Sequence, residues 1–250
     1  MNDHELAARL ATEAGALLLD VRAEFADAST AERKSAGDTR SHDFLLAALT
    51  AERPDDVVLS EEGPAEDTEP ARLSASRVWI VDPLDGTREF SEAGRTDWAV
   101  HVALWERTGS GGELVAGAVA LPAQGITLAT PTVVAPPAGP DAPRVVVSRT
   151  RPPAIALQVK EALSGTLVEM GSAGAKVASV VQGLSDVYVH AGGQYEWDSA
   201  APVAVARAAG LHTSRIDGSP LVYNQRDCRL PDLIVCRPEL AEAVLAVTAG

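Results

Sequence analysis

The stretch Val81-Asp82-Pro83-Leu84-Asp85-Gly86-Thr87-Arg88-Glu89-Phe90 follows an apolar, β-branched segment, Arg77 to Val81, that we expect to be a buried strand. The strand delivers two carboxylates, Asp82 and Asp85, into a sharp loop, where the proline restricts the backbone and the glycine permits a tight turn. Two carboxylates at this spacing can share divalent cations. An ordinary Asp-rich turn explains the pattern equally well, so the rest of the sequence has to decide.

The composition favours a globular protein that does not bind polyanions. The chain has 250 residues and a mass of 26.0 kDa, which allows one large domain or two modest ones. A formal net charge of −14 argues against a nucleic acid polymer or an anionic membrane as a partner. An acidic chain can still bind a small phosphorylated metabolite when metal ions neutralise the site locally.

The two cysteines, Cys228 and Cys236, have a spacing that fits neither a zinc site nor a disulfide framework. The first residues are polar and acidic, unlike a signal peptide, and no apolar run is long enough to cross a membrane. We therefore expect reduced thiols and a cytoplasmic location.

The apolar pattern before residue 134 indicates an α+β half. We expect helices over 3–25 and 43–52, a polar stretch over 27–41, a buried strand over 57–60 and a surface loop over 64–76. Three further strands, over 98–105, 114–121 and 126–130, read as an antiparallel meander.

A Pro/Gly-rich segment, 134–140, is a linker candidate, and strands alternate with helices beyond it. The expected strands are 144–147, 166–170, 187–190 and 233–236, and the expected helices are 153–163, 173–182, 199–209 and 239–248. This alternation is typical of an α/β sheet covered by helices. The sequence thus predicts an N-terminal α+β half, residues 1–133, and a C-terminal α/β half, residues 134–250.

Carboxylates stand at the ends of several of these elements. Glu61 and Glu62 follow a strand, as do Asp82 and Asp85, and Asp43 and Asp198 stand where helices are expected to begin. Each alone has an ordinary explanation as a helix cap or a solvated loop residue. Together they are hard oxygen ligands of the kind that Mg²⁺ prefers, and the absence of His and Cys among them argues against zinc.

Three segments carry a family resemblance: Leu59-Ser60-Glu61-Glu62-Gly63, Trp79-Ile80-Val81-Asp82-Pro83-Leu84-Asp85-Gly86-Thr87 and Trp197-Asp198-Ser199-Ala200-Ala201-Pro202. They resemble, in the same order, the signatures of the lithium-sensitive, Mg²⁺-dependent inositol monophosphatase superfamily. The resemblance covers nearly the whole chain and implies a layered α-β-α-β-α sandwich.

By position, the resemblance implies that Glu61, Asp82 and the backbone carbonyl of Leu84 hold one Mg²⁺. It further implies that Asp82, Asp85 and Asp198 hold a second Mg²⁺, with Asp82 between the two. A third, weaker ion often lies near the residue that corresponds to Glu61.

The resemblance also assigns the groups around the phosphate. The backbone N–H groups of Gly86 and Thr87 are expected to bind it, as the start of a helix does. The water that attacks the phosphorus would be oriented by Thr87 and Asp43. Asp38 competes for the role of Asp43, because the segment before Asp43 is about one residue shorter than the family pattern.

Three features indicate which phosphate ester is hydrolysed. Thr87-Arg88-Glu89-Phe90 resembles the Thr-Lys-Glu-Phe of the CysQ-type branch, which acts on 3′-phosphoadenosine 5′-phosphate (PAP). The segments Val147–Arg149 and Gly171–Lys176 resemble those that hold the nucleotide in that branch. Ala191 stands where inositol phosphatases have a glutamate.

These features imply that Arg149, Ser172, Lys176 and His190 contact the substrate, His190 standing where that branch usually has arginine. The predicted function is a Mg²⁺-dependent phosphomonoesterase that converts PAP to AMP and phosphate, in sulfate assimilation or nucleotide detoxification. The alternatives are an inositol-1-phosphate or fructose-1,6-bisphosphate phosphatase, or a non-catalytic relative that binds Mg²⁺ or a nucleotide. The expected partner is a small phosphorylated metabolite; a homodimer is a further possibility that the sequence leaves open.

Overall fold

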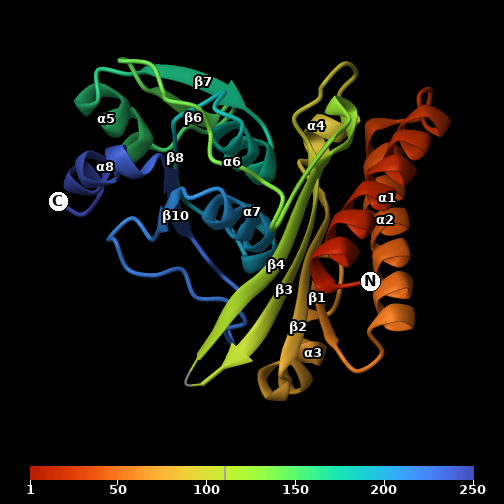
Figure 1. Cartoon of the computed structure of the whole chain (residues 1–250). Helices are drawn as coiled ribbons and strands as arrows, with labels where there is room; N and C mark the ends of the chain where they lie inside the picture. The colour runs from red at the N-terminus through yellow and green to blue at the C-terminus, as the bar shows by residue number, and fades with distance from the viewer. Residues whose placement is uncertain (110) are drawn as a thin grey trace.

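Figure 1 shows the computed structural model of the chain, which describes residues 1–109 and 111–250 and, for residues 65–68, the backbone alone. Two helices, a first sheet, two further helices, a second sheet and a last helix pair are stacked in five layers. The layered α-β-α-β-α sandwich predicted from the sequence is therefore confirmed. Within the described residues no helix is long and apolar enough to cross a membrane.

The first two layers come from the N-terminal half of the chain. Their elements are α1 (Asp3–Glu24), α2 (Thr30–Glu52), β1 (Val57–Ser60), α3 (Ala65–Ser74), β2 (Arg77–Asp85), α4 (Thr87–Ser91), β3 (Ala99–Thr108), β4 (Gly111–Leu121), η1 (Pro122–Gln124) and β5 (Ile126–Ala129). The strands form one sheet in the order β1-β2-β3-β4-β5, with β1 and β2 parallel and the other pairs antiparallel.

The other three layers come from the C-terminal half. Their elements are β6 (Arg144–Ser148), α5 (Ala154–Ala162), β7 (Thr166–Met170), α6 (Ala173–Val181), β8 (Val187–Ala191), α7 (Glu196–Ala208), β9 (His212–Ser214), β10 (Asp232–Cys236), η2 (Pro238–Leu240) and α8 (Ala241–Thr248). The sheet order is β7-β6-β8-β10-β9; β6 is parallel to β7 and β8, and β10 is antiparallel to both of its neighbours. A division into two domains at residue 134 stays a prediction.

Strand β2 is buried on both faces, which explains its continuous apolar sequence. Trp79 and Val81 pack with α1 and α2, whereas Val78 and Ile80 face the layer of α6 and α7. Because successive side chains of a strand point to opposite faces, β2 joins two hydrophobic cores and carries its last residues into the space between them.

The polar stretch predicted over residues 27–41 was wrong, since α2 begins at Thr30 and not near Asp43. The Ser29 side chain accepts the N–H of Glu32, and the Glu32 carboxylate accepts the N–H of Ser29 in return. The buried residues of α2 recur every fourth position, Gly37, Ser41, Leu45 and Leu49. Polar side chains cover the rest of the helix, so its apolar stripe is narrow and was missed.

The surface loop predicted over residues 64–76 was also wrong, because α3 occupies most of it. Arg72 near the end of α3 is almost fully buried and donates to the carbonyls of Gln225 and Arg226. An acidic, proline-containing sequence thus forms a helix that is anchored to the loop before β10.

Candidate metal and phosphate site

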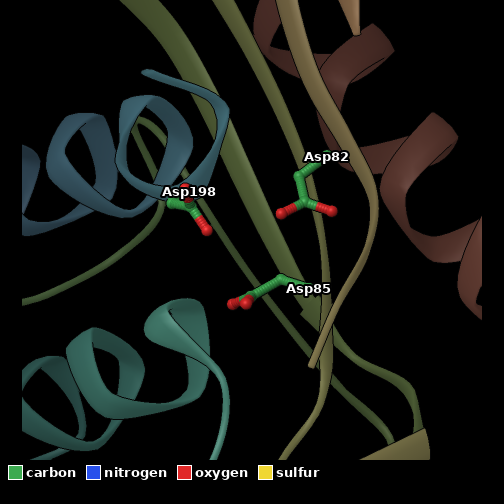
Figure 2. Close-up of side chains that lie close together, drawn as sticks. All are labelled: Asp82, Asp85 and Asp198. Carbon is green, nitrogen blue, oxygen red and sulfur yellow. The ribbon is translucent and has the colours of Figure 1, made fainter. Parts of the chain in front are cut away.

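Three carboxylates converge between the end of β2 and the start of α7. One carboxylate oxygen each of Asp82, Asp85 and Asp198 lies within 4.8 Å of the other two. Figure 2 shows the three side chains pointing into the same space, Asp82 and Asp85 from β2 and Asp198 from the first turn of α7. The predicted ligands from two distant segments are therefore brought together.

The loop between Asp82 and Asp85 owes its shape to a break in the sheet. The pairing of β2 with β3 shifts register between these two residues. The Asp82 carboxylate accepts the N–H of Leu84 at 3.0 Å, and the hydroxyl of Ser41 in α2 donates to the Pro83 carbonyl at 2.7 Å. These bonds present Asp82 and Asp85 on one side of the strand.

Asp85 is bound by the N-terminus of α6. Its oxygens accept the Ser172 hydroxyl at 2.5 Å and the backbone N–H groups of Ala173 and Gly174 at 3.1 and 2.5 Å. His101 Nε2 lies 3.3 Å from the same carboxylate. Burial opposes ionisation, but the adjacent His101 and the hydrogen bond from Ser172 outweigh it and lower the pKa of Asp85 to about 2.

The pKa values of the other carboxylates in the site are raised instead of lowered. Burial, together with the charges of Glu61, Asp85 and Asp198, raises the pKa of Asp82 well above its ordinary value. Desolvation and the neighbouring acids raise the pKa of Asp198 to about 6 and that of Glu61, a solvent-accessible residue just after β1, to about 7. So much negative charge in a buried space binds protons unless a cation compensates it.

The donor set fits a hard divalent cation. Asp82, Asp85 and Asp198 form a group that could hold a metal ion, and all the donors are carboxylate oxygens. Glu61 adds a carboxylate near enough to Asp82 for its charge to raise the pKa of Asp82. The carbonyl oxygen of Leu84 lies between Asp82 and Asp85 in the same loop, and it accepts a hydrogen bond from the Thr87 hydroxyl at 3.2 Å.

The structure places Asp38, not Asp43, beside Thr87. The Thr87 hydroxyl lies 3.4 Å from Asp38 Oδ1, and burial and the charge of Glu62 raise the pKa of Asp38 to about 6. Asp43 is exposed. Since α2 is one continuous helix, residues five positions apart project about 140° from each other, so both cannot face the site.

Two close approaches fix this arrangement. A Cβ on Gly37 would lie 2.8 Å from side-chain atoms of Leu84 and Phe90, so α2 touches the loop next to Asp38. Gly86 has a φ of +86°, and a Cβ there would lie 3.0 Å from the Ser172 Cβ. The chain can therefore turn from β2 into α4 at this point with glycine, and no larger residue fits without strain.

A cavity of about 290 Å³ opens beside Thr87. It lies between the first turn of α4, the end of β6 and the start of α6. Its lining residues are Gly86, Thr87, Arg88, Glu89, Ser148, Arg149, Thr150, Arg151, Gly171, Ser172 and Lys176. The cavity thus joins the predicted phosphate position to three of the four predicted nucleotide contacts, Arg149, Ser172 and Lys176.

The two predicted cationic contacts already have partners. Arg149 donates to Glu89 and Glu92, each at 2.7 Å. Lys176 is 6% exposed, and its ammonium donates to the carbonyls of Gly171 and Ser172 at 3.0 and 2.6 Å. Lys176 therefore stabilises the turn that presents Ser172, and Arg149 would have to exchange a partner to reach an anion.

His190 near the end of β8 is half-buried and does not line this cavity. Its Nε2 has no hydrogen-bond partner among the described residues. Burial and the nearby Lys176 charge lower the pKa of His190 to about 4, so the ring is neutral near pH 7. Its contact with substrate stays a prediction.

Sequence reasoning missed His101, and it placed the start of α7 too late. His101 lies inside an apolar run of β3, where a single polar residue gave no signal. Its pairing with Asp82 in the β2–β3 ladder could have identified it. Helix α7 begins at Glu196, and Asp198 in its first turn accepts the N–H of Tyr195 at 2.7 Å.

Comparisons with known proteins identify the family to which this site belongs. The profile of the inositol monophosphatase family matches residues 3–133 and 142–249. The chain is 54% identical over 242 residues to the 3′-phosphoadenosine 5′-phosphate phosphatase of Mycobacterium tuberculosis (strain CDC 1551 / Oshkosh), covering 95% of this chain and 90% of that protein. It is 30% identical over 206 residues to the 3′(2′),5′-bisphosphate nucleotidase CysQ of Escherichia coli K12, covering 77% and 80%.

A solved structure has the same fold. The crystal structure of CysQ from Bacteroides thetaiotaomicron superposes with a TM-score of 0.75 at 27% identity. The alignment covers 93% of this chain and 96% of that one.

Proposed function

The chain belongs to the inositol monophosphatase family, and we propose that it is a Mg²⁺-dependent phosphatase that hydrolyses PAP to AMP and phosphate. The observation that carries the proposal is the convergence of Asp82, Asp85 and Asp198 beside Thr87, in a chain that is 54% identical to a protein named as a PAP phosphatase. A non-catalytic relative would have no need to keep this set complete.

In this proposal two Mg²⁺ ions are held by the carboxylates and one carbonyl. Glu61, Asp82 and the Leu84 carbonyl would hold one, and Asp82, Asp85 and Asp198 the other. When bound, the ions supply Lewis-acid activation of water and neutralise the phosphate charge. A third ion near Glu61, a homodimer and a cytoplasmic location stay predictions.

The chain's own groups then orient the reactants. The Thr87 hydroxyl and the Asp38 carboxylate, 3.4 Å apart, are placed to hold a water between them and the phosphorus. With a pKa of about 6, Asp38 is mostly ionised near pH 7 and can accept a proton from that water. The N–H groups of Gly86 and Thr87 at the start of α4 are the proposed donors to the phosphate.

The cavity beside Thr87 supports a substrate with a second anionic group. Four cationic side chains line it, Arg88, Arg149, Arg151 and Lys176, and its one acid, Glu89, is paired with Arg149. A guanidinium can move from a carboxylate to a phosphate, because both accept the same two-pronged hydrogen bond. Ala191 offers no carboxylate for inositol hydroxyls, which disfavours the inositol phosphatase alternative.

The test is phosphate release from PAP by the purified chain, with Mg²⁺ and after treatment with EDTA. We expect release only with Mg²⁺, restored when the metal is returned, and AMP as the organic product. Equal release in EDTA would contradict metal dependence, and adenosine 3′-phosphate as the product would contradict the proposed orientation of the substrate.

A further inference from the structure

His101 is a fully buried histidine between the two groups of metal ligands. It belongs to β3, is 0% exposed, and pairs with Asp82 at the last position before the β2–β3 register shift. A Cβ on Gly174 in α6 would lie 1.9 Å from His101 Nε2, so α6 packs directly on the ring. A side chain larger than that of glycine at position 174 would therefore overlap the imidazole.

Both ring nitrogens face acceptors. Nδ1 donates to the Trp197 carbonyl at 3.0 Å, and Nε2 lies 3.3 Å from Asp85 Oδ2. Only the Nδ1 contact is a hydrogen bond; Nε2 lies against the Asp85 carboxylate without one. The ring thus contacts the end of β2 through Nε2 and the first turn of α7 through Nδ1.

This double contact connects two ligands that come from different layers of the sandwich, Asp85 from strand β2 and Asp198 from helix α7. Trp197 immediately precedes Asp198, and Asp85 is the last residue of β2. Asp85 already has three donors from α6, so its own orientation does not depend on His101. What the imidazole adds is a link of fixed length between Asp85 and the backbone beside Asp198.

We propose that His101 is a positioning residue that sets the separation of Asp85 and Asp198, and thereby the affinity for the cation that these two share. The inference rests on the metal site of the proposed function. Groups that orient metal ligands typically contribute about 10- to 100-fold to metal affinity. A purely electrostatic role predicts the opposite sign, since removing an N–H donor beside the cation would reduce repulsion.

The test compares His101→Asn with His101→Gln. The Asn amide lies near the Nδ1 position and can still reach the Trp197 carbonyl, whereas the Gln amide extends toward Asp85. Each variant keeps one half of the link. We expect isothermal titration with MgCl₂, without substrate, to give Mg²⁺ binding weaker by about tenfold or more in both variants.

His212→Gln in β9 is the matched control, because His212 bonds to Ser214 and touches no ligand. It should bind Mg²⁺ as the wild-type chain does. Thermal unfolding in EDTA measures the stability of each variant independently of Mg²⁺ binding. If one His101 variant fails to fold, Mg²⁺ binding by the other variant tests the inference.

Unchanged or tighter Mg²⁺ binding by the folded His101 variants would overturn the inference, as would a lower unfolding temperature in EDTA with unchanged Mg²⁺ binding. Absence of Mg²⁺ binding by the wild-type chain would remove the proposed function as well. The two failures are therefore distinguishable.

Discussion

Asp82 is the most deeply buried of the three converging carboxylates, with 1% of its surface exposed. Burial and the charges of Glu61, Asp85 and Asp198 raise its pKa well above the ordinary value. We predict that Asp82→Asn retains less than about a tenth of wild-type activity, because an amide oxygen lacks the charge that both ions need. Steady-state phosphate release at saturating Mg²⁺ measures this, and a rate above that tenth would contradict a ligand shared by two ions.

Asp38 and Asp43 form a matched pair on one helix. We predict that Asp38→Asn lowers kcat by about 100-fold, a typical loss for a general base, with Mg²⁺ binding largely kept. Asp43→Asn should stay within about twofold of wild type, because an exposed side chain on another face of α2 does not reach Thr87. Comparison of kcat for the two variants decides; a larger loss at Asp43 would restore the assignment made from sequence.

Among individual residues, the sequence predicted those that belong to a recognisable motif. Asp82, Asp85 and Asp198 could be named in advance because their segments have distinctive neighbours, Pro83 and Trp197 among them. Asp38 could not be separated from Asp43, since the choice depends on the rotational phase of a helix whose start was misplaced. His101 lies in an apolar strand, and nothing local distinguishes it from a core residue.

Helix α6 determines the conformation of Asp85, because its N-cap residue Ser172 and its first two residues all donate to that carboxylate. We predict that Gly174→Ala destabilises the fold by about 1–3 kcal/mol and weakens Mg²⁺ binding, since the added methyl overlaps the His101 ring. Urea unfolding and Mg²⁺ titration measure the two effects. Gly193→Ala is the control, because nothing lies within 4 Å of a Cβ there. Equally small changes in unfolding free energy and Mg²⁺ affinity in both variants would contradict this prediction, because they would mean that α6 can shift away from His101 at little cost.

The strands were predictable because their apolar runs are short and bounded by Gly, Pro and charged residues, as in the meander of β3, β4 and β5. The first half of α2 and the whole of α3 were not, because one buried residue in four leaves α2 mostly polar and α3 has an acidic sequence with an internal proline. Ser29 with Glu32 was the local signal for the start of α2, and it indicates that capping pairs deserve weight when an apolar stripe is narrow.

The molecule as a whole has a formal net charge of −14, and its acidic site adds to that repulsion. Glu61 and Asp198 have folded-state pKa values of about 7 and about 6, raised from 4.5 and 3.8 by desolvation together with the charges of the neighbouring acids. Raised values mean that the folded chain binds these protons more tightly than the unfolded chain. Without metal, this contribution to stability is present at low pH and is lost as the pH rises through about 6 to 7.

Mg²⁺ competes with those protons, so we predict that the rise in melting temperature caused by MgCl₂ grows between about pH 5.5 and about pH 7.5. Thermal unfolding at both pH values, with KCl at equal ionic strength as the control, measures it. A rise of the same size at both pH values would mean that these carboxylates do not bind the ion.

The proposed activity of the whole molecule is that of a metal-dependent phosphatase that selects a bisphosphorylated nucleotide. The most direct measurement is kcat/KM for PAP, inositol-1-phosphate and fructose-1,6-bisphosphate in the same Mg²⁺ buffer. One additional charge-assisted hydrogen bond contributes about 1.5–3 kcal/mol, so PAP should exceed inositol-1-phosphate by about 10- to 150-fold. Fructose-1,6-bisphosphate, which has two phosphates and no nucleoside, should also fall below PAP. Hydrolysis of inositol-1-phosphate or the sugar bisphosphate at an equal or higher kcat/KM would contradict the account.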